Sequence, residues 1–162
     1  MTRRTVKLAT HATSNPMPGC QICETPWPEL GSFRYWRATV SHDQNYLGKC
    51  IIALRRHEED FLAMTEDERE EMWEAATKVR HALTRCFAPD HFNYQVLGNS
   101  VRHVHMHLTP RYTSPREFAG IAFSDEHWGT WPFPVDKELP RGFLKSLAEA
   151  ISHEMPSEGV VK

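Results

Sequence analysis

Apolar and polar positions along the chain predict four strands in two pairs. Residues 33–40 alternate bulky and polar side chains, and residues 50–54 form a short apolar run, as strands do. Residues 92–97 and 103–108 have a similar pattern and are joined by the turn-forming segment 98–100.

Two helices are predicted, one between the strand pairs and one after them. Thr65 and Glu68 have the spacing of a capping box at the start of the first helix. Pro89 marks its end, because the residue before a proline disfavours helix. The second helix covers about residues 141–152. Strands and helices in this order, without βαβ alternation, are typical of an α+β fold with an antiparallel sheet.

The pattern divides the 162-residue chain into one domain with a tail and an extension. Residues 1–18 are polar and contain two prolines, so we expect a flexible N-terminal tail. Residues 19–113 form the predicted domain. Residues 114–162 form a C-terminal extension that includes a loop over 118–134 and ends with the second helix, packed on the same domain.

Charge and cysteine content narrow the possible functions. The formal net charge of −2 excludes a strongly basic nucleic-acid binder. No apolar run approaches the roughly 18 residues of a membrane span, and the N-terminus lacks the apolar core of a secretory signal. We therefore expect no nucleic-acid or membrane partner and a cytoplasmic location. The four cysteines are too few for a disulfide scaffold and are expected to be reduced or metal-bound.

The segment 103–108 carries the most informative chemistry. It reads HVHMHL, and because successive side chains of a strand point to opposite faces, its three histidines are expected to share one face. Three interpretations are open on these residues alone. The histidines can be a polar surface, a metal site, or the nucleophile of a covalent mechanism in which a neutral imidazole attacks.

The longer segment HVHMHLTPRY resembles the signature of the histidine-triad (HIT) family of nucleotide hydrolases and transferases. Thr109 departs from the apolar residue that the family motif has at that position. The similar flanking motifs are Cys20-Gln-Ile-Cys23, Arg55-Arg56-His57, Asn93-Tyr94, Gly98-Asn99-Ser100, Pro110-Arg111-Tyr112 and Trp128-Gly129. Together these motifs, over about residues 20–131, are similar to the bacterial diadenosine-polyphosphate-hydrolase-like branch of the family.

The resemblance implies a fold and an activity. The fold would be an antiparallel five-stranded sheet with two main helices, continued across a homodimer. The activity would be cleavage at the α-phosphate of a nucleotide, of the dinucleoside polyphosphate or nucleotidyl phosphoramidate class, without an organic cofactor. His105 would attack phosphorus and form a nucleotidyl-histidine, which water hydrolyses. His107 would contact the phosphate and leaving group, and His103 would support the nucleophile or bind metal.

Five further residues match positions where the family binds substrate. Asn99 and Ser100 would contact the phosphate oxygens, although Gly-Asn-Ser is also ordinary turn chemistry. Asn93 and Asp43 would contact ribose or base. Lys49 stands where many family members carry a fourth histidine. A lysine cannot relay a proton as a neutral imidazole does, but it can hold a polyphosphate by charge, and an exposed strand-end lysine is the alternative.

Cys20 and Cys23 have three interpretations on their spacing alone: a redox pair, a disulfide, or half of a zinc site. The resemblance implies a structural zinc ion held by Cys20, Cys23, His57 and His103. Cys50 and Cys86 are expected in the core. All five tryptophans are expected to pack or to lie at interfaces.

Two alternatives to the covalent mechanism are kept. One is a metal-dependent hydrolase in which the three histidines bind a catalytic metal. The other is a nucleotide-binding regulatory module with little turnover, which the lysine at position 49 keeps open.

Overall fold

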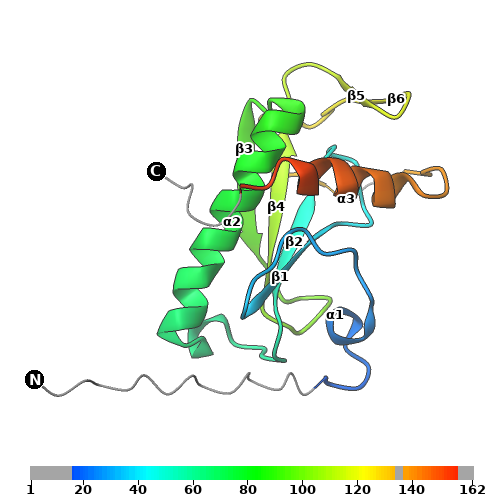
Figure 1. Cartoon of the computed structure of the whole chain (residues 1–162). Coiled ribbons are helices and arrows are strands. Elements are labelled where there is room, and N and C mark those ends of the chain that lie inside the picture. Colours follow the sequence, from blue (N-terminus) through cyan, green and yellow to red (C-terminus); the bar gives the residue numbers. More distant parts are fainter. Residues whose placement is uncertain (1–15, 134–136, 157–162) are drawn as a thin grey trace, which may run out of the picture.

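The fold is that of a computed structural model, which describes residues 16–133 and 137–156 (Figure 1). An antiparallel sheet has the strand order β1-β2-β4-β3, and the long helix α2 packs on it. The strands of this sheet are β1 (Trp36–Val40), β2 (Cys50–Leu54), β3 (His91–Val96) and β4 (His105–Arg111). The predicted α+β class with an antiparallel sheet is confirmed.

The remaining elements surround this sheet. A hairpin is formed by β5 (Arg116–Phe118) and β6 (Ile121–Phe123). The helical elements are α1 (Gln21–Glu24), η1 (Phe61–Ala63), α2 (Glu66–Phe87) and α3 (Phe143–His153). The last helix packs against α2 and β1. The predicted tail lies mostly in residues 1–15, outside the described residues.

Period-two alternation gives the sheet two different faces. One face carries the apolar residues that meet α2 in the core: Trp36, Ala38, Val40, Cys50, Ile52, Leu54, Phe92, Met106 and Leu108. On the other face, Ile51 of β2 pairs with His107 of β4, and Ala53 pairs with His105. The register therefore places the two histidines of β4 on the face away from α2.

The start of α2 holds the start of β1. Thr65 and Glu68 form the predicted capping box, with both of its hydrogen bonds present. The Glu71 carboxylate accepts hydrogen bonds from the backbone N–H groups of residues 34–36. Trp36 donates its indole N–H to the backbone carbonyl of Glu68 at 2.7 Å. These bonds satisfy backbone donors just where the strand begins.

Three boundaries differ from the sequence prediction. The strand expected from residue 33 begins at Trp36, because Glu71 takes the preceding backbone N–H groups. The strand expected over 103–108 instead covers His105–Arg111. It continues through Pro110 because pairing with β2 ends at Leu108, so no β2 partner needs the missing proline N–H.

The strand count also differs. Among the described residues the main sheet has four strands instead of the five implied by the resemblance, and only a single bridge, Glu29 to Thr39, adds to its β1 edge. Part of the predicted loop over 118–134 is the β5–β6 hairpin. Ala119 and Gly120 both have positive φ there, the backbone that a two-residue hairpin turn requires. Within the described residues no helix is long and apolar enough to cross a membrane.

Gly48 joins the loop after β1 to β2 in a backbone conformation that disfavours other residues, with φ of +85°. A Cβ atom there would lie 2.7 Å from Cδ2 of Leu83, a fully buried residue of α2. Gly48→Ala is therefore expected to lower the free energy of unfolding by about 2–4 kcal/mol, from backbone strain and overpacking together. Urea unfolding measures the change.

Gly98→Ala is the matched control, since nothing lies within 4 Å of its Cβ position. It should change the free energy of unfolding by less than about 0.5 kcal/mol. If Gly48→Ala were as stable as Gly98→Ala, the close packing of this loop on α2 would be wrong.

Candidate active site

The three histidines of the triad segment are divided between two sites. His105 and His107 lie on the same face of β4, with ring centroids 4.9 Å apart, and both line one pocket. His103 precedes the strand, and its Nδ1 lies 3.4 Å from Sγ of Cys20. Only two of the three histidines, His105 and His107, therefore share the expected strand face.

The tautomer of His105 is selected by its neighbour. Its Nδ1 lies 2.6 Å from the backbone carbonyl oxygen of His103. A carbonyl oxygen only accepts, so Nδ1 carries a proton, and in the neutral ring the lone pair is on Nε2. The ring is buried, with an exposed fraction of 7%. The hydrogen bond thus selects, for the neutral imidazole, the tautomer that a nucleophile needs.

His107 is held neutral by its surroundings. Burial lowers the pKa of His107 to about 4, and the nearby His105 and Lys49 act in the same direction. Its Nδ1 is buried and has no hydrogen-bond partner among the described residues. His107 thus lines the pocket as a neutral imidazole, and one of its ring nitrogens is buried without a partner.

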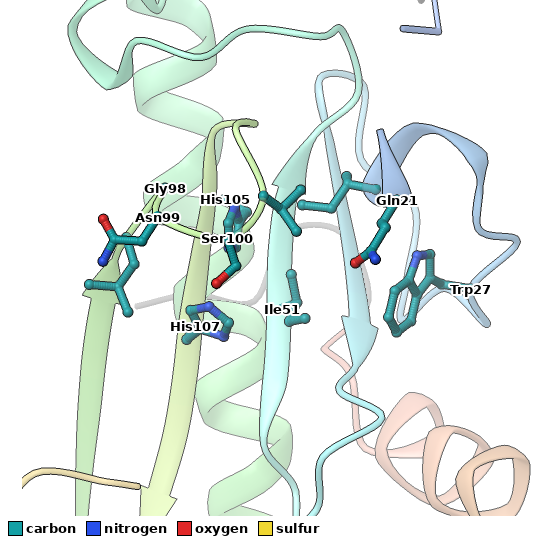
Figure 2. Close-up of a pocket in the computed structure, with 11 residues that line it drawn as sticks. Gln21, Trp27, Ile51, Gly98, Asn99, Ser100, His105 and His107 are labelled. Carbon is teal, nitrogen blue, oxygen red and sulfur yellow. The ribbon is translucent and has the colours of Figure 1, made fainter. Parts of the chain in front are cut away.

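The pocket has a volume of about 280 Å³, near the lower end for small-molecule sites. Figure 2 shows Asn99 at one side, Gln21 and Trp27 at the other, and the two histidines between them. The lining residues are Gln21, Ile22, Trp27, Ile51, Leu97, Gly98, Asn99, Ser100, Val101, His105 and His107. The pocket therefore has a polar end beside β4 and an aromatic and aliphatic end beside α1.

The predicted substrate-binding residues do not all line the pocket. Asn99 and Ser100 lie in the segment between β3 and β4 and line the polar end of the pocket. Lys49 and Asp43 form an ion pair, Nζ to Oδ2, at 2.6 Å. Both exert a charge effect on His107, but neither is among the eleven described residues that line the pocket.

A buried glutamine side chain stabilises the loop that carries this ion pair. The buried Gln44 donates to the backbone carbonyls of Ser41 and Lys49 and accepts from the Gly48 N–H. Lys49 immediately precedes β2, two residues before the pocket residue Ile51. Alternation along the chain therefore directs Lys49 toward the histidine face of the sheet.

Asn93 belongs to a different cluster. Its Oδ1 accepts from Nη1 of Arg111 at 2.7 Å. The Arg111 guanidinium also forms a two-point ion pair with Asp125, and the backbone carbonyls of His127 and Thr130 accept its remaining bonds. The side chains of Arg111 and Asp125 are only 4% and 0% exposed. Asn93 does not line the pocket.

Cys20, Cys23, His57 and His103 gather their ligand atoms within 4.8 Å of one another. Nδ1 of His103 lies 3.6 Å from Sγ of Cys23, and Nδ1 of His57 lies 3.7 Å from the same sulfur. Nε2 of His103 donates to the carbonyl of Leu54 at 2.7 Å, which leaves Nδ1 unprotonated on the cysteine side. Two thiols and two imidazoles at this spacing fit a tetrahedral zinc ion.

Sequence reasoning missed the aromatic end of the pocket. Trp27 was expected to pack or to lie at an interface, yet it is only partly buried and lines the pocket with Gln21 and Ile22. Its position depends on how the segment around α1 docks on the sheet, which local patterns do not report. A weak signal was available: Trp27 follows the cysteine pair closely and stands between two prolines.

The chain belongs to the HIT domain family, whose sequence profile matches residues 30–114, more than half of the chain. This is a family of nucleotide hydrolases and transferases. No curated protein matches the sequence.

Several solved structures share the fold. A histidine triad nucleotide-binding protein from Sulfolobus tokodaii is 18% identical with a TM-score of 0.63, over 83% of this chain and 89% of that one. A histidine triad protein from Sinorhizobium meliloti is 18% identical with a TM-score of 0.64, over 78% and 88%. A zinc-bound histidine triad family protein from Mycobacterium smegmatis is 14% identical with a TM-score of 0.59, over 83% and 94%.

The lowered pKa of His107 predicts a specific pH dependence of stability. The folded protein keeps His107 neutral down to about pH 4, whereas in the unfolded chain it takes up a proton below its ordinary value of about 6.5. The stabilisation that neutral His107 gives the folded protein is therefore present above pH 6.5. It is lost as the pH falls toward 4, and the free energy of unfolding then decreases by up to about 3 kcal/mol. His107→Asn should flatten the fall in unfolding free energy over this range.

The measurement is urea unfolding at pH 7 and pH 5, with exposed His81→Asn as the control. All three proteins keep the same metal-ligating residues, so the difference between their slopes reports His107. Equal slopes for His107→Asn and the wild type would contradict the buried, neutral state of His107.

Proposed function

We propose that the protein is a nucleotide hydrolase or nucleotidyl transferase that cleaves at a nucleoside α-phosphate through a covalent intermediate on His105. The observation that carries this proposal is the hydrogen bond from His105 Nδ1 to the carbonyl of His103. It leaves the Nε2 lone pair on a ring that lines the pocket.

The reaction proceeds in two steps, formation of the nucleotidyl-histidine and its hydrolysis. The Nε2 lone pair forms a bond to the α-phosphorus while the bond from phosphorus to the leaving group breaks, and the leaving group departs with that electron pair and takes a proton from solvent. Water then attacks the phosphorus and releases a proton to solvent, the P–Nε2 bond breaks, and the nucleoside monophosphate is released as His105 regains its lone pair. A transfer reaction follows the same course with another acceptor in place of water.

The other residues stabilise charge during these steps. Asn99 and Ser100 offer an amide and a hydroxyl at the polar end of the pocket, where they would donate to the phosphoryl oxygens. His107, neutral at pH 7, would contact the phosphate and the leaving group. Lys49, ion-paired with Asp43, would stand beside His107 and offer its ammonium group to a polyphosphate.

The flanking sequence motifs support assignment of the protein to one branch of the family. We place the protein among diadenosine-polyphosphate-hydrolase-like members that act in the cytoplasm as homodimers. Dinucleoside polyphosphates and nucleotidyl phosphoramidates are the proposed substrate classes. For Asn93, contact with ribose or base would require the Arg111 cluster to open, so its proposed role is to support Arg111.

The cysteine and histidine cluster is proposed to hold a structural zinc ion. When bound, the ion would join the segment of α1 to the sheet through His57 and His103. The thiols and imidazoles form a closed set of four ligands, which leaves no position for a substrate. The division of the histidines also favours the covalent mechanism over a triad-bound catalytic metal, since His105 and His107 are outside the cluster.

The nucleophile is tested with His105→Ala. Turnover of diadenosine tetraphosphate and of adenosine phosphoramidate should fall by at least 10³-fold, because the intermediate cannot form. Binding of the monophosphate should change far less, because the rest of the pocket stays intact. Release of the monophosphate is measured with a chelator present. His105→Ala that turns over normally would disprove the mechanism, and loss of wild-type turnover on chelation, in protein that circular dichroism shows to be still folded, would instead support a catalytic metal.

The metal is tested by removal. The full chain should bind one equivalent of zinc, and Cys20→Ser should lower the melting temperature by roughly 10 °C, the shift that a loss of about 3 kcal/mol produces in a domain of this size. The control is Cys86→Ser, a half-buried cysteine outside the cluster. A melting temperature that neither chelation nor Cys20→Ser changes would contradict a structural zinc site.

A further inference from the structure

Exposed aromatic side chains gather in the segment that follows β6, outside the pocket of Figure 2. Three of the six residues 128–133 are aromatic. Trp128, Trp131 and Phe133 are 45%, 57% and 50% exposed. None of the three is among the described residues that line the pocket. Exposed rings grouped in one short segment are typical of a surface that binds a ligand or a partner.

The backbone of this aromatic segment, residues 127–133, is held by Arg111. The buried guanidinium donates to the carbonyls of His127 and Thr130. The Thr130 N–H closes a turn on the same His127 carbonyl at 3.0 Å, and the His127 imidazole packs against the Phe133 ring, with centroids 5.3 Å apart. The exposed rings are therefore carried by a fixed main chain, so a ligand that contacts them has less conformational entropy to overcome.

The aromatic segment borders the loop that carries the Lys49 ion pair. Asn45 donates its side-chain N–H to the carbonyl of Phe133 at 3.1 Å and its backbone N–H to the Asp43 carboxylate. Asp43 pairs with Lys49 at 2.6 Å. Lys49 lowers the pKa of His107 and Asp43 raises it, so both charges lie near that ring. A continuous set of contacts thus leads from the aromatic segment to a histidine of the pocket.

The separation between the two ends suits an elongated ligand. Arg111 and His107 lie on the same face of β4. Their spacing along the chain corresponds to roughly 13 Å along a strand. A single phosphate beside His105 cannot extend over that distance, whereas a chain of several phosphates followed by a ribose can. Lys49, next to His107, offers a positive charge to such a chain.

A ligand that reaches the aromatic segment from the pocket therefore has to combine a polyanion with a flat ring at its far end. Nucleobases stack on exposed tryptophans, and this contact tolerates any base. A dinucleoside polyphosphate carries a second base at the far end of its phosphate chain. After cleavage at the first α-phosphate, that base belongs to the leaving group.

We infer that Trp128 and Trp131 bind the base of the leaving nucleotide, which gives the protein a second nucleoside site outside the pocket. This inference rests on the proposed function, which places the cleaved α-phosphate beside His105. The site distinguishes a dinucleoside polyphosphate from a nucleoside polyphosphate with the same phosphate chain. Both tryptophans are specificity-determining residues and take no part in bond breaking.

The experiment measures binding to full-length His105→Ala by calorimetry, so that turnover does not interfere. The ligands are diadenosine tetraphosphate and adenosine 5′-tetraphosphate, which has the same phosphate chain but one nucleoside. The dinucleotide should bind about 10- to 100-fold more tightly, the range expected for one stacked base. Adding Trp128→Leu and Trp131→Leu should bring the two affinities within about threefold of each other and leave that for adenosine 5′-tetraphosphate nearly unchanged.

Three controls separate stacking from folding and from other surfaces. Trp73→Leu removes a 65% exposed tryptophan of α2 and should keep the preference for the dinucleotide. Phenylalanine at positions 128 and 131 keeps aromatic faces and should retain most of the preference even if the leucine variant is poorly folded. Diadenosine diphosphate should bind no better than ADP, because its chain is too short to reach the aromatic segment.

Two results would overturn the inference: no preference for the dinucleotide in His105→Ala, or a preference that the leucine variant keeps. If the leucine variant keeps the preference but has a lower mass in sedimentation, the aromatic segment binds a second copy of the chain instead. These outcomes leave the proposed function standing if monophosphate release still depends on His105. Conversely, a preference that depends on the two tryptophans, in a protein that never turns over a substrate, supports the second site and refutes the proposed reaction.

Discussion

The hydrogen bond between His105 Nδ1 and the backbone carbonyl of His103 is the contact on which the site depends. It fixes the tautomer of the proposed nucleophile through a main-chain atom, so its geometry is set by the position of residue 103. That position is fixed in turn by the ring of the same residue. Its Nε2 donates to Leu54, and its Nδ1 faces the two cysteines. His103 therefore links the cysteine and histidine cluster to the proposed nucleophile.

The sheet extends this arrangement over the rest of the pocket. β4 lies between β2 and β3, so the register that pairs Ile51 with His107 also sets the distance between the apolar and polar ends. The opposite face of the same strands packs on α2, which leaves the histidine strand little freedom to shift. The core and the pocket thus use alternate residues of the same strands.

Much of this could be predicted from the sequence because it depends on local periodicity. The capping box at Thr65, the length of α2 and the shared face of His105 and His107 all follow from spacing of a few residues. The start of β4 could not be predicted this way. The Val104 N–H donates to the carbonyl of Glu58, a partner in a distant loop, so the strand begins later than its pattern indicates.

The pocket residues and the predicted binding residues show the same division. Asn99 and Ser100 are next to the triad in sequence and also in space. Trp27 lines the pocket because the segment that carries it docks on the sheet, through contacts such as Cys20 with His103, 83 residues away. Asn93 matches a family position that contacts ribose or base, yet its side chain binds Arg111 and does not line the pocket. Tertiary contacts decide these cases, and no short motif encodes them.

The buried pair of Arg111 and Asp125 makes the C-terminal segment part of the same cooperative unit as the histidine strand. A guanidinium with so little exposure is tolerable only while its carboxylate and carbonyl partners stay in place, since a buried charge without them costs several kcal/mol. The partners come from residues 125–130, and the arginine belongs to the strand that bears His105 and His107. Opening of that segment and loosening of the active-site strand are therefore one thermodynamic event, so the lifetime of a competent site is set partly by a region remote from its chemistry.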